Sequence, residues 1–171
     1  MRLKSLAIIS LILVAFSGQA QICKYVVNEK DPLTDDIIRT VKTRLTGPTP
    51  FYYFYYIRNG SDYKFQVEVG DYGELSTSIP KGSELVMRAG NGKVIRMTSI
   101  DKADPEVIND FGSKITQYKV TYQMTEQDMT DIAESGIVFI RIKDMKNTFS
   151  DQEIPEAVVQ ISKENAECIF K

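Results

Sequence analysis

The chain has 171 residues, with 21 basic side chains, 23 acidic side chains and no histidine. The chain therefore lacks the surplus of basic side chains with which proteins bind nucleic acid or anionic membranes. The absence of histidine excludes Ser-His-Asp and Cys-His catalytic groups and every zinc site that contains histidine. We therefore expect neither a cofactor nor a metal centre.

The N-terminus has the pattern of a secretory signal peptide. Arg2 and Lys4 precede an apolar run over residues 6–16, and small residues follow within positions 17–20. The run is shorter than the roughly 20 residues of a membrane span, so we expect cleavage after residue 20 and no span in the mature chain. A lipoprotein is the competing interpretation because Cys23 follows shortly, but residues 20–22 do not match the usual small residues before a lipidated cysteine. The pattern predicts export to the periplasm, the cell surface or the medium.

Residues 21–171 are predicted to form a single domain, because 151 residues are enough for one sizeable core. With 19 basic and 23 acidic side chains, this mature chain has a net charge of −4. Its two cysteines, Cys23 and Cys168, lie near its two ends. In an oxidising compartment such a pair favours a disulfide over two buried free thiols.

The first half of the mature chain reads as strands joined by short turns. We expect a strand opening at residues 25–27 and another over 37–45, with an acidic turn over 31–36 between them. This turn lacks the spacing of EF-hand ligands, which favours a plain turn over a calcium loop. An aromatic strand over 51–57 and an alternating strand over 63–69 follow.

The turn between these two strands decides which side chains enter the core. A two-residue turn at Asn59 and Gly60 would bury one set of alternating side chains: Tyr52, Phe54, Tyr56, Tyr63, Phe65 and Val67. The opposite face would then carry Phe51, Tyr53 and Tyr55 beside Lys64, Gln66 and Glu68. A three-residue turn would exchange the two faces.

Four side chains on that opposite face are candidate ligand-binding residues: Tyr53, Tyr55, Lys64 and Gln66. Tyrosine rings beside hydrogen-bonding side chains can stack on a sugar or hold a partner strand, because tyrosine buries a ring while its hydroxyl stays wet. The alternative is that the C-terminal segment covers this face, since proteins seldom leave a large apolar patch open. The absence of tryptophan argues against a sugar platform.

Residues 84–97 predict a β-hairpin around the sequence Gly-Asn-Gly. A three-residue loop over 90–92 pairs apolar residues with apolar residues, Leu85 with Met97 and Met87 with Ile95, whereas a two-residue loop would mix both faces. Gly92 is expected in the left-handed conformation. The polar stretch 101–112 is interpreted as a surface loop.

The second half contains the clearest helix. A strand over 115–123 precedes a helix over 126–135, with Thr125 as N-cap, Asp128 in a capping box and Gly136 as its end. Its carboxylates, among them Asp131, are expected to face water. The apolar run 137–142 predicts a strand covered on both faces. Residues from Ser150 onward, with Pro155 and the apolar positions Ala157, Val158, Ile161 and Cys168, fit a C-terminal helix, although Val158 and Val159 would also suit a strand.

Together these elements predict a mainly β fold. We expect an antiparallel β-sandwich or a strongly curved sheet, with the short helix 126–135 and a C-terminal helix against it. An open barrel is the alternative architecture.

Three segments, residues 28–34, 81–95 and 124–142, carry a resemblance to a known group. They include the sequences Asn-Glu-Lys-Asp-Pro-Leu-Thr and Met-Thr-Glu-Gln-Asp-Met. The chain resembles a loose group of uncharacterised secreted β-rich proteins of Bacteroidetes, although Thr-Asp-Asp follows Leu33 where the group tends to have glycine. The resemblance implies a small antiparallel β fold with cysteines near both ends. It implies no activity and no catalytic residues.

Two functions from different classes remain open. The preferred hypothesis is an exported, non-enzymatic binding or interaction domain whose partner is a protein or a glycan. The alternative is a carbohydrate-active enzyme that works with two carboxylates, because such chemistry needs no histidine.

Overall fold

The computed structural model describes residues 23–45, 51–110, 112–143 and 149–171. The predicted signal peptide, residues 1–20, lies outside this part of the chain. The described elements, in chain order, are β1 (Tyr25–Lys30), β2 (Ile37–Arg44), β3 (Phe51–Asn59), β4 (Asp62–Tyr72), β5 (Glu84–Ala89), β6 (Val94–Thr98), β7 (Glu106–Asp110), β8 (Ser113–Met124), α1 (Glu126–Ser135), β9 (Ile137–Lys143), β10 (Phe149–Glu153) and α2 (Glu156–Cys168).

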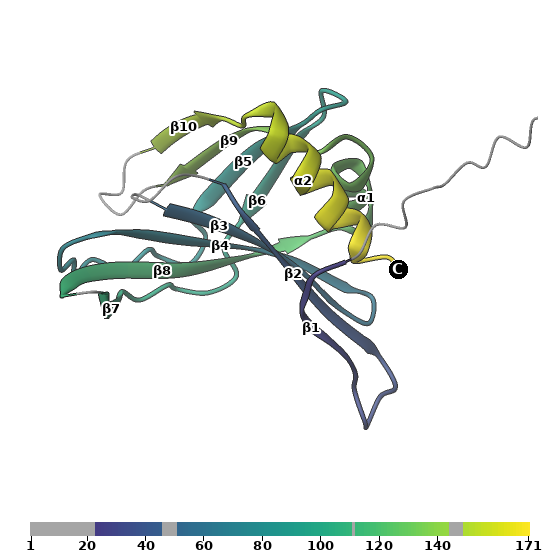
Figure 1. Ribbon diagram of the computed structural model, residues 1–171, viewed down its shortest axis with the longest axis horizontal. Coiled ribbons are helices and arrows are strands. Elements are labelled where there is room, and N and C mark those ends of the chain that lie inside the picture. The colour runs from purple at the N-terminus through teal and green to yellow at the C-terminus, as the bar shows by residue number, and fades with distance from the viewer. Residues whose placement is uncertain (1–22, 46–50, 111, 144–148) are drawn as a thin grey trace, which may run out of the picture.

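The strands form two antiparallel sheets. The larger sheet has the order β1-β2-β3-β4-β8-β7, and the smaller has the order β10-β9-β5-β6. The larger sheet is strongly curled into a half-barrel, and the smaller sheet packs against it together with both helices (Figure 1). A bridge between Ser99 and Tyr122 connects the end of β6 to β8. The predicted mainly β fold, with a strongly curved sheet in a sandwich-like arrangement, is confirmed.

The β3–β4 hairpin has the predicted faces but a different turn. Asn59 pairs with Asp62 across a loop of Gly60 and Ser61, so Tyr56 lies opposite Phe65 and not opposite Tyr63. Gly60 takes the first loop position with φ 60°, which glycine adopts without strain. Because the loop still has two residues, every side chain keeps its face. The predicted core residues Tyr52, Phe54, Tyr56, Tyr63, Phe65 and Val67 are all at most 5% exposed.

The β5–β6 hairpin confirms the three-residue loop. Leu85 pairs with Met97 and Met87 pairs with Ile95, and all four side chains are buried. Gly92 has φ 87°. The apolar face of this hairpin therefore points into the space between the two sheets.

Two strands were not predicted from the sequence. The expected loop 101–112 contains β7, which pairs with β8 at one edge of the larger sheet. Residues 149–153 form β10, which pairs with β9 at one edge of the smaller sheet. Edge strands pair on one side only and are often short and polar, so they lack a strong apolar alternation. The prediction that 137–142 is covered on both faces is wrong, because Arg141 is exposed and pairs with Asp151 of β10.

Both predicted helices are present. The helix α1 spans 126–135 as predicted, and its cap hydroxyl on Thr125 accepts a hydrogen bond from the Asp128 amide at 3.1 Å. The helix α2 begins after Pro155, so the strand alternative for Val158 and Val159 is wrong, and so is the helical start at Ser150, which lies in β10. Within the described ranges, no helix has the length and apolar character required to cross a bilayer.

The helix α2 lies on the core side of the larger sheet. Its Asn165 amide donates to the Thr43 hydroxyl at 2.6 Å, and its Ser162 hydroxyl lies 2.7 Å from the Tyr56 hydroxyl. Thr43 and Tyr56 belong to neighbouring strands, and both are buried. These contacts place α2 over β2 and β3.

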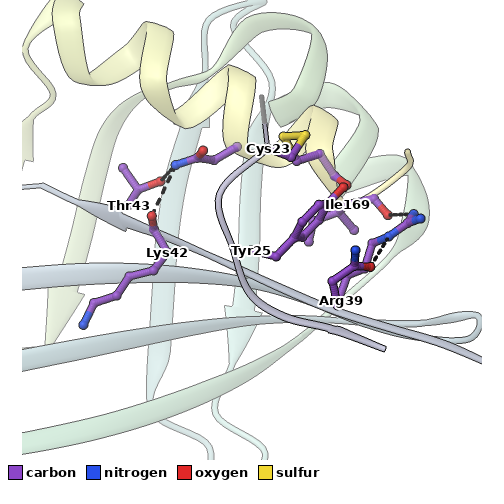
Figure 2. The surroundings of a disulfide bond; sticks show 9 residues. Cys23, Tyr25, Arg39, Lys42, Thr43 and Ile169 are labelled. Atoms are coloured by element: carbon purple, nitrogen blue, oxygen red, sulfur yellow. Dashed lines mark hydrogen bonds between the residues drawn. A yellow bond between two sulfur atoms is a disulfide. The ribbon is translucent and has the colours of Figure 1, made fainter. Parts of the chain in front are cut away.

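Cys23 and Cys168 form the predicted disulfide, with their Cα atoms 5.7 Å apart (Figure 2). The Tyr25 hydroxyl also donates to the Cys168 carbonyl at 3.0 Å, and the Arg39 guanidinium donates to the Ile169 carbonyl at 3.4 Å. The segment that leads into β1 is therefore held against the C-terminal end of α2.

Candidate functional site

The four predicted ligand-binding side chains share the face of the larger sheet that is opposite α2. On β3, Tyr53 and Tyr55 alternate with buried residues, and both are half-buried. Gln66 of β4 is the direct cross-strand partner of Tyr55. Lys64 lies two residues before Gln66 on β4, and its ammonium pairs with Asp62 at 2.8 Å. The sheet therefore groups Tyr53, Tyr55 and Gln66, while Lys64 lies beside this group and is engaged by a carboxylate.

The neighbouring strand β2 adds two cations that were not predicted. Register places Lys42 opposite Tyr55 and Arg44 opposite Tyr53. The Lys42 ammonium lies 3.7 Å from the centre of the Tyr53 ring and 4.9 Å from that of Tyr55. The Arg44 guanidinium carbon lies 5.7 Å from the Tyr53 ring centre. We name the surface formed by Lys42, Arg44, Tyr53, Tyr55, Gln66, Glu68 and Thr121 the tyrosine face.

These cation–π contacts position charge without neutralising it. Each is worth about 0.5–1 kcal/mol at an exposed site, enough to favour side-chain conformations that lie over the rings. Figure 2 shows the Lys42 carbonyl directed toward α2, where Asn165 donates to it, while the Lys42 side chain extends away from that helix. The ammonium therefore belongs to the face of the sheet that α2 does not cover.

A carboxylate lies beneath the tyrosines. The Tyr55 hydroxyl donates to Glu68 at 2.5 Å, and Glu68 is only 7% exposed. Burial, followed by the hydrogen bond to Glu68 and its negative charge, raises the pKa of Tyr55 far above its usual value. The Tyr55 hydroxyl is thus a fixed donor that keeps its proton, and the aromatic ring is the part of Tyr55 that can bind a ligand.

The face also carries neutral hydrogen-bonding groups. The Gln66 amide donates to the Thr121 hydroxyl of β8 at 2.9 Å, and both side chains are half-buried. The carboxamide oxygen and the hydroxyl group retain further hydrogen-bonding capacity. The tyrosine face thus combines aromatic rings, amide and hydroxyl groups, and positive charge.

A separate pocket of about 400 Å³ lies where the ends of β2, β3 and β4 approach the start of α1. Its lining includes Asp35, Asp36, Arg58, Tyr63 and Glu126. All three carboxylates are exposed. The Arg58 guanidinium donates to the Gly60 carbonyl at 2.8 Å, and the Tyr63 hydroxyl donates to Glu126 at 3.3 Å. The polar groups of this pocket are thus partly engaged with one another.

The prediction that Asp131 of α1 faces water is wrong. It is 8% exposed and accepts hydrogen bonds from Lys93 at 2.5 Å and Asn91 at 3.1 Å, both in or beside the β5–β6 loop. The hydrogen bond from Lys93 and its positive charge lower the pKa of Asp131, and Asp131 and Asp128 together raise the pKa of Lys93. This cluster attaches the hairpin to the helix and has a structural role.

The acidic turn 31–36 is a plain turn held by its own side chain. The Asp31 carboxylate accepts hydrogen bonds from the backbone amides of Leu33 and Thr34 at 2.7 and 3.1 Å. Across the described ranges, no group of three or more cysteine, aspartate or glutamate side chains could hold a metal ion.

Comparison of the chain with models of protein families, with curated proteins and with solved structures gives no match.

Proposed function

We propose that this protein is an exported, non-enzymatic binding domain whose ligand contacts the tyrosine face. The observation that carries the proposal is the grouping of Tyr53, Tyr55 and Gln66 on one face of the larger sheet, with Lys42 over the rings. The second sheet and both helices pack against the other face (Figure 1). The binding groups are therefore on the side of the sheet that these elements leave open.

The chemistry of the face favours binding over catalysis. Its buried acid, Glu68, accepts a hydrogen bond from the Tyr55 hydroxyl, and the raised pKa of Tyr55 keeps the proton on that hydroxyl. Tyrosine is well suited to contact surfaces because a rigid ring and a polar hydroxyl are immobilised at little entropic cost. The disulfide and the resemblance to secreted Bacteroidetes proteins support the exported location.

Affinity electrophoresis of the mature protein in gels that contain soluble polysaccharides tests this proposal, with pull-down from cell-surface extracts for protein partners. We expect Tyr53→Ala and Tyr55→Ala to weaken binding about tenfold or more, because hot-spot aromatic residues dominate binding energies. The matched control is Tyr72→Ala at the end of β4, which removes a tyrosine that is 60% exposed. A ligand that is bound equally well by Tyr53→Ala and by the native protein would show that the tyrosine face is not the binding surface.

The alternative function, a two-carboxylate carbohydrate-active enzyme, has a candidate location in the pocket near Glu126. Asp36 and Glu126 are the carboxylates that would act there, although both are exposed and so lack the apolar surroundings that tune a catalytic acid. Release of reducing sugar from the same polysaccharides tests this alternative. Hydrolysis that disappears in Glu126→Gln or Asp36→Asn would replace the binding proposal with an enzymatic one.

A further inference from the structure

The charges of the larger sheet's open face are mostly paired with each other. Lys64 pairs with Asp62 at 2.8 Å, and Lys119 lies 4.0 Å from Glu106. The carboxylate of Glu68 is held by the Tyr55 hydroxyl. These groups neutralise one another or are buried, so they offer little net charge to a ligand.

Lys42 differs from these cations. Within the described residues, its ammonium has no carboxylate at ion-pair distance, and its neighbours are the rings of Tyr53 and Tyr55. Arg44 adds a second positive charge on the same side of β2, over the outer edge of this tyrosine pair. The Lys42 ammonium therefore places a positive charge at the tyrosine pair even though the mature chain as a whole is acidic.

The two rings also prepare the ammonium for a ligand. A lysine that is held over aromatic rings has already lost part of its side-chain freedom in the free protein, so less ordering remains to be done on binding. The rings do not satisfy its hydrogen-bond donors, and all three N–H groups can turn toward an anion. An anionic group that approaches Lys42 meets Gln66 and the tyrosine rings as its immediate surroundings.

We propose that the ligand of the tyrosine face is an acidic polysaccharide, an inference that rests on the proposed binding function. A carboxylate of a uronic acid residue pairs with Lys42. The sugar ring places its C–H groups against Tyr53 or Tyr55, and its hydroxyl groups hydrogen-bond with Gln66.

An acidic polypeptide fits this face less well. Extended peptides usually bind sheets by adding a strand to an edge, where unpaired backbone groups are available. Tyr53, Tyr55 and Gln66 lie on β3 and β4, which are paired on both sides at these residues, whereas β1 pairs with β2 only as far as Val41. Recognition at the two tyrosines and Gln66 therefore uses side chains, and rings with an amide and an ammonium match the hydroxyl and carboxylate groups of an acidic sugar.

The test compares polygalacturonate and alginate with their carboxyl-reduced, neutral forms and with poly-glutamate, using the disulfide-bonded mature protein. We expect binding to the two polyuronates that weakens as salt is raised, because salt screens the charge interaction. Lys42→Met should weaken it about tenfold or more, since a charge-assisted hydrogen bond is lost, and Lys42→Arg should retain most of it. The matched control Lys81→Met removes an exposed lysine from the turn before β5 and should leave binding unchanged.

The outcomes separate this inference from the function on which it rests. Equal binding of the neutral forms, lost in Tyr53→Ala but not in Lys42→Met, overturns the acidic ligand and leaves the binding face in place. Binding of poly-glutamate in preference to both polyuronates identifies an acidic polypeptide and also overturns it. If the native protein binds neither polyuronate, the acidic-polysaccharide inference is overturned directly. If a probe is bound equally well by the native protein, Tyr53→Ala and Tyr55→Ala, the proposed function is overturned as well. Circular dichroism spectra that match the native protein establish that each variant is folded.

Discussion

Two carboxylates show that the face of a strand or helix does not by itself decide exposure. Glu68 lies on the open face of the larger sheet, and Asp131 lies on the side of α1 that was expected to face water. Both side chains are nevertheless less than a tenth exposed. Each has a specific partner, Tyr55 for Glu68 and Lys93 for Asp131. Buried carboxylates require such partners, because an unpaired buried charge is strongly destabilising.

Replacement of Tyr55 by phenylalanine tests the first pair. We expect Tyr55→Phe to lower the free energy of unfolding by about 1–3 kcal/mol, because Glu68 stays buried without its donor. Urea unfolding at neutral pH measures the loss, and Tyr72→Phe, at an exposed position, is the control. An unchanged unfolding free energy in Tyr55→Phe would mean that the Glu68 carboxylate is solvated or has another donor.

The second pair predicts a pH dependence of stability. Lys93 lowers the pKa of Asp131 in the folded state. The contribution of this ion pair to the free energy of unfolding is therefore fully present above the unfolded pKa of about 3.9, and it is lost as the pH falls through the folded pKa. We expect Asp131→Asn to reduce the unfolding free energy by about 1 kcal/mol at pH 7, a modest value because water screens the partly exposed Lys93. The difference should shrink as the pH falls below about 4.

Urea unfolding of the native protein and Asp131→Asn from pH 7 to pH 2.5 measures this difference. Glu134→Gln, which removes an exposed carboxylate from the same helix, is the control and should show no such trend. A difference that persists unchanged to the lowest pH would assign the effect to packing and not to the ion pair.

At the scale of elements, glycines set how closely the helices approach their neighbours. Gly136, which ends α1, has φ 71°, and a Cβ atom at this position would lie 2.6 Å from the Val159 carbonyl of α2. Its own carbonyl accepts a hydrogen bond from the Gly90 amide at 3.0 Å. One residue thus joins the end of α1, the helix α2 and the β5–β6 hairpin.

Two glycine substitutions separate backbone strain from this close contact. Gly92→Ala has the strain of a left-handed residue but meets no atom within 4 Å, so we expect a loss of about 1–2 kcal/mol. Gly136→Ala forces α1 and α2 apart, and the backbone there, at φ 71° and ψ 177°, is a conformation that essentially only glycine adopts, so its loss should be clearly larger. Thermal unfolding followed by circular dichroism compares the two, and equal losses would show that the α1–α2 contact adjusts freely.

At the scale of the whole molecule, the disulfide closes residues 23–168 into one loop. Cys23 and Cys168 are 145 residues apart. In the chain-entropy model such a loop stabilises the folded state by about 5 kcal/mol, an upper figure because residual structure in the unfolded chain reduces it. The bond acts where β1, an edge strand with pairing on one side only, meets the C-terminal end of α2.

We expect the double variant Cys23→Ser with Cys168→Ser to unfold at a lower temperature than the native protein, and reduction of the native protein to have the same effect. Intact mass after alkylation, with and without prior reduction, determines the state of the cysteines. Two alkylated thiols in the unreduced sample would show that the bond does not form in the exported protein.

Local sequence patterns were sufficient to predict most of the elements and their faces. The turn glycines, the Thr125 cap and the alternation in β4 and β5 predicted the hairpins, the helix α1 and the buried tyrosines, because side-chain period and turn chemistry depend on neighbouring residues only. The same alternation placed Tyr53, Tyr55, Lys64 and Gln66 on one face. The edge strands β7 and β10 were missed because their pairing depends on the strand beside them more than on their own composition.

The candidate site itself required the tertiary structure. Lys42 and Tyr53 belong to different strands, and only the register of β2 against β3 puts the ammonium over the ring. Whether α2 covers the tyrosines or the opposite face was likewise undetermined in the sequence, because both faces of the β3–β4 hairpin carry aromatic residues. Contacts of α2 with Thr43 and Tyr56 settle that question, since side chains of one helix can pack on only one face of a sheet.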